Sequence, residues 1–393
     1  MSDAMIPFEL ENEEGLRLRG LDFGATLTSL TLPVAGGRRE VLLGCTDEAY
    51  PTQQVWLGAV AGRFANRIGN AELLRDGQRW PLDANQPPHC LHGGRAGFHR
   101  QHWQVKEREA DRVRLALISR AGDQGFPGNL RVTLEYRLEQ CDLVVDFVAS
   151  TDAPTPVSLT SHTYFNLDDN PDGGDVRNHL IRLNADRFLP TDPSGLPLAI
   201  APVEGPFDLR HERLIGQDWL SHPQQQQAKG YDHAFVLNGP SAEWAARVVS
   251  GDRQLTMEVY TNQPSLQFYS GNWLANTPAR GGQLHRDYDG FCLEAQQLPD
   301  SPNRPALGDP WFAAGADLPP SDPLPLYRRQ LTPAPSSPTQ TCRAKRAGVT
   351  PRLCSQTSPR KESLWMITTS PPPTATSASP IDPPVVTACA CPA

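Results

Sequence analysis

Alternation of apolar and polar side chains over residues 131–138 is the feature that most constrains the fold. The apolar positions of this segment are separated by Arg, Thr or Glu, and they are Val132, Leu134, Tyr136 and Leu138. A period of two is typical of a β-strand that buries one face. A polar turn at residues 139–142 precedes the apolar run Leu143–Ala149, so the two segments are predicted to form a hairpin.

Further apolar runs predict further strands at Val113–Ile118, Leu255–Thr261 and Leu266–Tyr269, whereas Ala242–Val249 is compatible with a short helix. Gly and Pro separate many of these short segments. This pattern predicts an all-β fold, a large antiparallel β-sandwich or barrel.

The size and charge of the chain indicate its domain organisation and the class of molecule that it binds. All-β domains often exceed two hundred residues, so 393 residues fit one large domain and a tail. A formal charge of -8 argues against binding to nucleic acid, which attracts cationic surfaces. The acidic N-terminal segment does not resemble an export signal, and no apolar run is long enough to span a membrane. We therefore expect a small, neutral partner.

The eight cysteines are scattered and include no CxxC pair. This pattern favours reduced thiols, a cytoplasmic location and no structural disulfide.

The composition changes after Trp311, where Pro, Ser and Thr become frequent and acidic residues rare. Such a segment buries too little apolar surface to offset its ordering entropy. We therefore predict a folded domain over residues 1–311 and a disordered tail over residues 312–393. A basic interaction tail is the functional alternative.

A histidine-rich segment, HCLHGG, contains His89, Cys90 and His92, and His99 and His102 follow it. Imidazole and thiolate are common zinc ligands, but the segment lacks a ligand set at a standard spacing. The two glycines after His92 instead predict a tight loop that presents one imidazole. No metal site is expected.

Four other segments contain residue types suited to acid–base or hydroxyl-binding chemistry. Their motifs are GRFANRI at 62–68, SHTYFNL at 161–167, YDHAF at 231–235 and GFCLEAQQLPD at 290–300. Taken one at a time, each pattern leaves an alternative open: His162 as a packing residue, Asp232 at a polar strand edge, and Glu294 as a solvated carboxylate.

In their order along the chain, eight segments resemble the aldose 1-epimerase (galactose mutarotase) family. They cover roughly the first three hundred residues and are GATLTSLTLP at 24–33, GRFANRIGN at 62–70, LHGG at 91–94, GFPGNL at 125–130, SHTYFNL at 161–167, GYDHAFVL at 230–237, LQFYSGNWL at 266–274 and GFCLEAQQLPDSPN at 290–303.

The resemblance implies a galactose-mutarotase-like β-sandwich that acts on free hexoses such as galactose and glucose, without metal or organic cofactor. It makes Glu294 the proton acceptor and His162 the proton donor. The residues that it implies for binding the sugar hydroxyls are Asn66, Arg67, His92, Thr163, Tyr164, Asp232 and Gln267.

The chemistry of anomer interconversion requires these residue types. Opening a cyclic hemiacetal removes a proton from the anomeric oxygen O1 and protonates the ring oxygen, so a base and an acid must flank the ring. Rotation about the C1–C2 bond and reclosure then give the other anomer, with the roles reversed. We expect apolar or carboxylate surroundings to raise the pKa of both Glu294 and His162, with Asp232 and Tyr164 contributing.

Two departures from the family pattern stand out. Ser161 occupies a position where the family commonly has Asn, and a changed orientation of His162 is one expected consequence. After Arg304, the Pro-Gly turn and closing strand of the family are not recognisable. A shifted reading frame would explain this, and the sandwich would then lack an edge strand.

Other functions are compatible with the same residues. They are a hexose-6-phosphate 1-epimerase, a non-catalytic sugar-binding module and a glycoside hydrolase that pairs Asp232 with Glu294. A cluster of cations placed for phosphate would favour the first. A monomer or a homodimer is expected.

Overall fold

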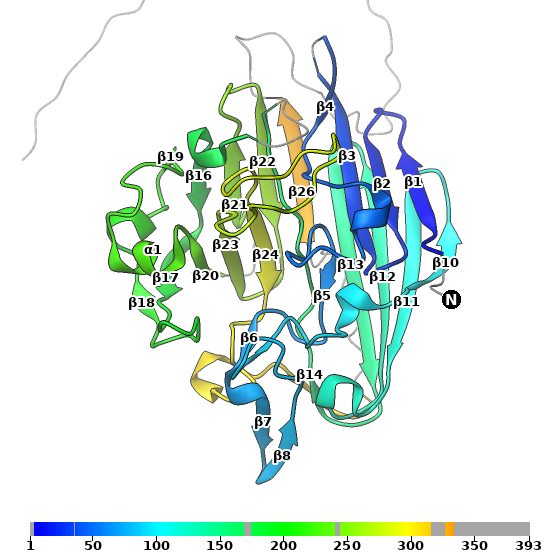
Figure 1. The fold of residues 1–393 in the computed structure, drawn as a ribbon, viewed down its shortest axis with the longest axis vertical. Coiled ribbons are helices and arrows are strands. Elements are labelled where there is room, and N and C mark those ends of the chain that lie inside the picture. Colours follow the sequence, from blue (N-terminus) through cyan, green and yellow to red (C-terminus); the bar gives the residue numbers. More distant parts are fainter. Residues whose placement is uncertain (1–3, 35, 169–173, 240–243, 316–326, 334–393) are drawn as a thin grey trace, which may run out of the picture. The chain divides into compact units, whose positions relative to one another are not determined.

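A computed structural model describes residues 4–34, 36–168, 174–239, 244–315 and 327–333. Three antiparallel sheets contain most of the strands (Figure 1). The predicted all-β fold is therefore confirmed. In the described part of the chain, no helix is long and apolar enough to cross a membrane.

The strands of each large sheet follow in spatial order. The four-stranded sheet contains β1 (Pro7–Glu11), β2 (Arg17–Leu21), β3 (Thr26–Val34) and β4 (Gly37–Glu40). The nine-stranded sheet contains β10 (Gln104–Arg108), β11 (Arg112–Ser119), β12 (Leu130–Glu139), β13 (Asp142–Thr151), β26 (Tyr327–Pro333), β22 (Leu255–Tyr260), β21 (Ala246–Val249), β16 (Leu180–Leu183) and β19 (Arg213–Leu214). The five-stranded sheet contains β18 (Ala201–Pro202), β17 (Ala185–Leu189), β20 (Asp232–Leu237), β23 (Ser265–Tyr269) and β24 (Cys292–Gln296).

Short ladders and helical turns connect these sheets. The two-stranded pairs are β5 (Val60–Ala61) with β15 (Thr160–Ser161), β6 (Arg67–Ile68) with β9 (Cys90–Leu91), β7 (Glu72–Arg75) with β8 (Gln78–Pro81), and β14 (Thr155–Pro156) with β25 (Trp311–Phe312). Among the described residues, the one α-helix is α1 (Pro223–Ala228). The 3-10 turns are η1 (Asp47–Ala49), η2 (Gly69–Ala71), η3 (Phe98–Arg100), η4 (Asp123–Gly125), η5 (Val176–Asn178), η6 (Gly205–Phe207) and η7 (Pro305–Leu307).

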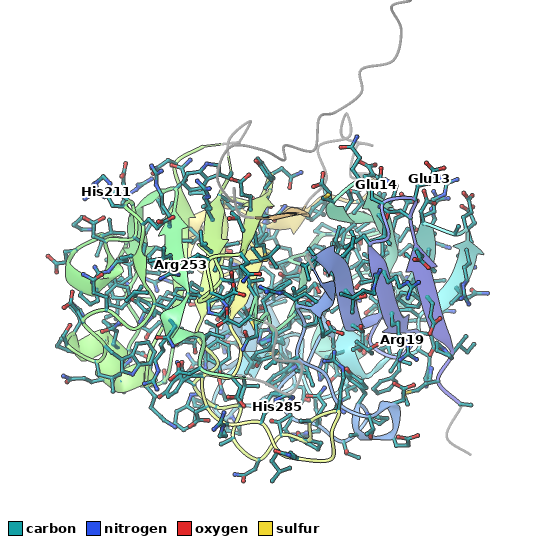
Figure 2. The ribbon with its side chains drawn as sticks, turned by 90° about the horizontal axis from the view of Figure 1, so that it is seen from above. Glu13, Glu14, Arg19, His211, Arg253 and His285 are labelled. Carbon is teal, nitrogen blue, oxygen red and sulfur yellow. The ribbon has the colours of Figure 1, made fainter. Side chains whose placement is uncertain are left out.

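One apolar core joins the inner faces of the three large sheets. Leu30 from β3, Leu134 from β12, Phe235 from β20 and Leu293 from β24 all belong to it, and each is completely buried. Charged residues such as Glu13, on the turn between β1 and β2, are exposed (Figure 2). Burial of alternate side chains from facing sheets is the packing expected of a β-sandwich.

The predicted hairpin is confirmed, because β12 and β13 pair in register from Leu130–Thr151 to Glu139–Asp142. The helix considered for Ala242–Val249 is wrong. Residues 246–249 form β21, which pairs with both β16 and β22. These pairings satisfy the backbone of a segment whose short apolar run did not distinguish strand from helix.

The C-terminal strand β26 corrects the expectation of a missing closing strand. It follows residue 311, the predicted end of the domain, and pairs with β13 on one side and β22 on the other. The strand therefore lies inside the nine-stranded sheet and not at its edge. The disorder predicted for the tail concerns residues that, apart from 312–315 and 327–333, lie outside the described part of the chain.

Candidate active site

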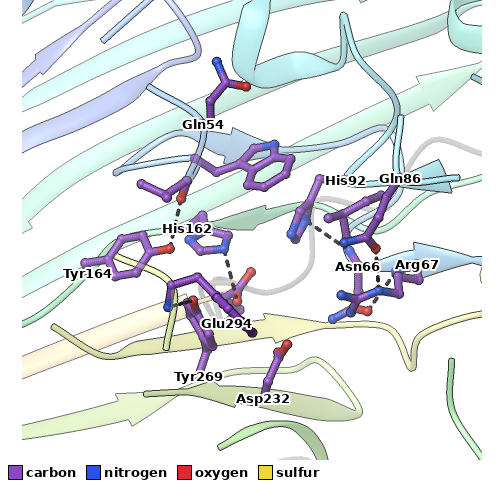
Figure 3. Close-up of a pocket in the computed structure, with 14 residues that line it drawn as sticks. Gln54, Asn66, Arg67, Gln86, His92, His162, Tyr164, Asp232, Tyr269 and Glu294 are labelled. Carbon is purple, nitrogen blue, oxygen red and sulfur yellow. Dashed lines mark hydrogen bonds and ion pairs between the residues drawn. The ribbon is translucent and has the colours of Figure 1, made fainter. Parts of the chain in front are cut away.

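A cavity of about 310 Å³ opens beside the five-stranded sheet (Figure 3). Its volume lies at the lower end of the range for small-molecule sites. The residues that line it are Gln54, Val55, Trp56, Asn66, Arg67, Gln86, Leu91, His92, His162, Tyr164, Asp232, Tyr269, Trp273 and Glu294. We refer to this cavity as the cleft.

Strand register brings the acidic side of the cleft together. Glu294 lies in the middle of β24, directly opposite Gln267 of β23, and Asp232 begins β20, opposite Tyr269 of β23. The Glu294 side chain is 3 % exposed, although β24 is the last strand of its sheet. The alternative of a solvated edge carboxylate is therefore wrong.

His162 follows β15 immediately, and its main chain is held on both sides. Its N–H donates to the carbonyl of Ala59, and its own carbonyl accepts from the N–H of Gly58. This anchoring places Nε2 of His162 3.8 Å from Oε1 of Glu294 (Figure 3). A single oxygen-bearing carbon of a ligand can contact both groups at that spacing.

The opposite side of the cleft comes from the β6–β9 ladder. Arg67 pairs with Leu91, so Asn66 and His92 lie next to each other at the ends of the two strands. The N–H of Asn66 donates to Nδ1 of His92 at 3.2 Å, which places the remaining imidazole proton on Nε2. Arg67 donates from Nε to Oε1 of Gln86 at 2.7 Å.

The predicted tight loop after His92 is confirmed. Gly93 has a φ of +84°, and a Cβ there would lie 2.0 Å from the carbonyl oxygen of Gly62. Only glycine allows this close approach. His92 itself has a φ of +50° and Trp56 a φ of +53°, values that are uncommon for such residues and that cluster at functional sites.

The two arginines of the GRFANRI motif separate in the fold. Arg63 is buried, and its guanidinium donates to the carbonyls of Pro127, Gly128 and Ser119. It therefore holds the scaffold together, whereas Arg67 reaches the cleft.

Burial controls the protonation of the two cleft histidines. It lowers the pKa of His162 to about 4 and the pKa of His92 well below its usual value, and nearby His162 lowers that of His92 further. The prediction that the surroundings raise the pKa of His162 is wrong, because burial disfavours the charged form, and for an imidazole that means a lower pKa.

Two of the predicted sugar-binding residues lie outside the set that lines the cleft. Thr163 is buried, and its hydroxyl bonds to the hydroxyl of Ser161 at 2.6 Å. Gln267 lies on β23, between the strands that carry Asp232 and Glu294, and donates from Nε2 to Oδ1 of Asp232 at 2.7 Å. The side chain of Ser161 is thus bonded to Thr163.

Several cleft residues were not found from the sequence. The ring of Trp56 lies 4.8 Å from that of His92 and 6.2 Å from that of His162, and the ring of Tyr269 lies 6.2 Å from that of His162. Tyr269 belongs to the LQFYSGNWL segment, so the resemblance to the family could have pointed to this residue. Trp56 and Gln86 belong to none of the eight matching segments.

Ligand atoms of His92, His162 and Glu294 lie within 4.8 Å of one another, the one such group among the described residues. Metal binding needs an unprotonated nitrogen that faces the ion. The hydrogen bond from Asn66 directs the lone pair of His92 away from the cleft and leaves an N–H there. The donor set therefore does not fit a metal ion in this arrangement.

Comparisons with known proteins agree with the fold. Residues 7–317 match the family model described as aldose 1-epimerase. The chain belongs to the aldose 1-epimerase family.

Relatives of this epimerase are similar over most of their length. The aldose 1-epimerase of Escherichia coli K12 is 44 % identical over 308 residues, which cover 77 % of this chain and 88 % of that protein. The human galactose mutarotase is 37 % identical over 304 residues, covering 76 % and 87 %. The crystal structure of galactose 1-epimerase from Lactobacillus acidophilus superposes with a TM-score of 0.72 at 27 % identity, covering 85 % of this chain and 96 % of that one. The chain is thus an isomerase-class enzyme that acts on carbohydrates.

Proposed function

We propose that this epimerase interconverts the α and β anomers of free hexoses such as galactose and glucose, with Glu294 as base and His162 as acid. The names of its relatives support the reaction. The observation that carries the assignment of residues is the buried pair of Glu294 and His162, 3.8 Å apart in the cleft.

The reaction begins with a sugar whose anomeric carbon faces this pair. Glu294 removes the proton from O1 while His162 protonates the ring oxygen, and the ring opens to the aldehyde. Because O1 and the ring oxygen share the anomeric carbon, one carboxylate and one imidazole at this spacing reach both. After rotation about the C1–C2 bond, the two groups exchange roles and close the ring.

The low pKa of His162 fits a group that donates a proton while the ring opens and accepts one while the ring closes. A buried imidazolium is a strong acid, so it transfers its proton readily to a weakly basic ring oxygen. The neutral imidazole that remains is the form favoured by burial.

Polar groups around the pair bind the hydroxyls in this proposal. Asn66 and Arg67 present amide and guanidinium donors, and His92 presents an Nε2–H. Asp232, oriented by Gln267, accepts hydrogen bonds from the hydroxyls. Gln267 acts through Asp232 in this proposal, and Thr163 bonds to Ser161, which does not line the cleft.

A phosphorylated hexose is a poorer fit. Among the described residues that line the cleft, Arg67 is the one permanently cationic side chain. A phosphate dianion is usually bound by several donors of that kind. A purely sugar-binding module would have no need of a buried carboxylate beside an imidazole.

Polarimetry tests the proposal. Freshly dissolved α-D-galactose and α-D-glucose are followed with and without the enzyme, and their rotation is expected to reach equilibrium faster than in buffer. Methyl α-D-galactoside is the control, because it has no anomeric hydroxyl and is expected to stay unchanged. If the enzyme accelerates anomer interconversion only of hexose 6-phosphates, these sugars replace free hexoses as its proposed substrate. Release of methanol from the galactoside would indicate a hydrolase.

We also propose a cytoplasmic enzyme that is a monomer or a homodimer. Cys45 and Cys90 are free thiols, which are common in reducing compartments. Light scattering of the purified protein measures the oligomeric state.

A further inference from the structure

Strand β24 contacts both ring nitrogens of His162. Oε1 of Glu294 lies 3.8 Å from Nε2, and Sγ of Cys292 lies 3.5 Å from Nδ1. Cys292 and Glu294 are two positions apart, so both side chains project from the same face of the strand. One strand face thus holds one imidazole at two points.

Cys292 lies behind the imidazole and not against the substrate. It is fully buried, and it does not belong to the described residues that line the cleft. Any effect of its thiol on the reaction therefore passes through His162.

A thiol suits a histidine that gains and loses a proton. It is both a weak donor and a weak acceptor, and its proton rotates about the Cβ–Sγ bond. After Nε2 of His162 has given its proton to the ring oxygen, the remaining ring proton is on Nδ1, where it donates to Sγ, and the unprotonated Nε2 faces the cleft. When His162 is protonated, Nδ1–H donates to Sγ. The same contact is satisfied in both states without movement of the ring.

We propose that Cys292 is a positioning residue for His162, whose thiol keeps a ring proton on Nδ1 and holds Nε2 toward the sugar, where this nitrogen gives up the transferred proton and takes it back. This inference rests on the proposed role of His162 as the acid. It adds a residue that touches no substrate but decides which nitrogen the substrate meets.

Other groups pack around His162 besides the thiol. Rings of His92, Tyr164, Tyr269 and Trp56 lie between 5.0 and 6.2 Å from the imidazole. The titratable groups that surround it are therefore His92, Tyr164, Tyr269, Cys292 and Glu294.

Two substitutions of Cys292 distinguish the effect of its hydrogen bond to His162 from the effect of its packing. Cys292→Val fills a similar volume and suits a strand but cannot bond to Nδ1, whereas Cys292→Ser retains a donor and acceptor. We expect Cys292→Val to lower kcat by about tenfold with KM within about twofold, and to shift the pH profile of kcat. Cys292→Ser is expected to retain kcat within about threefold.

Cys45→Ala is the matched control. Cys45 is a buried thiol in the same apolar cluster as Cys292, and its hydrogen-bonding partner is Tyr50. A normal pH profile is expected for this variant. Equal losses in Cys45→Ala and Cys292→Val would mean that packing alone matters and would overturn the proposal.

Nitrogen-15 NMR of the imidazole gives a readout that does not depend on activity. In the folded wild-type protein at pH 7 we expect His162 to have its proton on Nδ1, and in Cys292→Val a mixture of tautomers. The same tautomer in both proteins, or unchanged kcat and pH profile in Cys292→Val, would refute the role of Cys292. A catalytically normal His162→Asn would instead refute the proposed acid and leave the tautomer result standing.

Discussion

Gln267 connects the two carboxylates of the cleft. It pairs with Glu294 across β23 and β24, and its Nε2 donates to Oδ1 of Asp232 on the other neighbouring strand at 2.7 Å. One buried amide thus fixes the acceptor geometry of Asp232 directly beside the proposed base.

Gln267→Leu removes this donor while preserving bulk. Asp232 then loses its orientation, so we expect KM for galactose to rise about tenfold with kcat within about threefold, because ground-state and transition-state contacts weaken alike. Steady-state polarimetry measures both constants. A loss confined to kcat would place Gln267 in proton transfer instead.

Glu294→Gln replaces the proposed base with an amide of the same shape. Turnover is expected to fall by about 10²- to 10⁴-fold, the usual contribution of a general base, while galactose still binds. Calorimetric titration checks binding and polarimetry checks turnover. Full activity of a folded variant would remove Glu294 from the mechanism.

His162→Asn removes the proposed proton donor but retains a polar side chain. We expect a loss of about 10²-fold or more in kcat, since the ring oxygen no longer receives a proton during opening. His99→Asn is a useful comparison, because His99 is another buried imidazole whose ring lies 5.6 Å from that of Trp56 but which does not line the cleft. Equal effects of the two substitutions would point to packing.

Buried histidines make the fold sensitive to mild acid. Burial lowers the pKa of His162 to about 4 and those of His99 and His233 to about 3, whereas an unfolded histidine titrates near its ordinary value of about 6.5. Between these values the unfolded chain binds more protons than the folded one, so stability is greatest above about pH 6.5 and falls as the pH decreases.

Urea unfolding at pH 7.5 and pH 5.5 measures this dependence. The midpoint is expected to be lower at pH 5.5, in a range where ordinary carboxylates remain ionised and contribute little. An equal or higher midpoint at pH 5.5 would contradict the lowered pKa values.

The pairing of strand β26 indicates how far the chain can be shortened from its C-terminus without loss of the fold. A protein that ends at residue 341 keeps the ladders with β13 and β22 and is expected to remain active. A protein that ends at residue 315 exposes two unpaired strands inside a sheet, so we expect aggregation or a drop in Tm of about 10 °C or more. Thermal unfolding of both proteins distinguishes a strand of the sheet from a dispensable tail. Equal Tm values would contradict the pairing of β26.

Local patterns in the sequence accounted for the strands with clear alternation. β12 and β13 could be placed because each strand determines its own buried face. β26 could not, since the segment YRRQLTP has no clear alternation and forms a strand by pairing with two distant neighbours. The same limit explains why Ala246–Val249 was open to interpretation as a helix.

By itself, the sequence determined the fold class and the family, and it predicted Glu294 and His162 as the acid–base pair, because all of these rest on contiguous motifs. Only the tertiary structure decided that Trp56 and Gln86 line the cleft and that Thr163 and Gln267 do not belong to the residues that line it. It also reversed the expected pKa shift of His162. Burial and cross-strand contacts depend on residues far apart in the chain, and no local pattern records them.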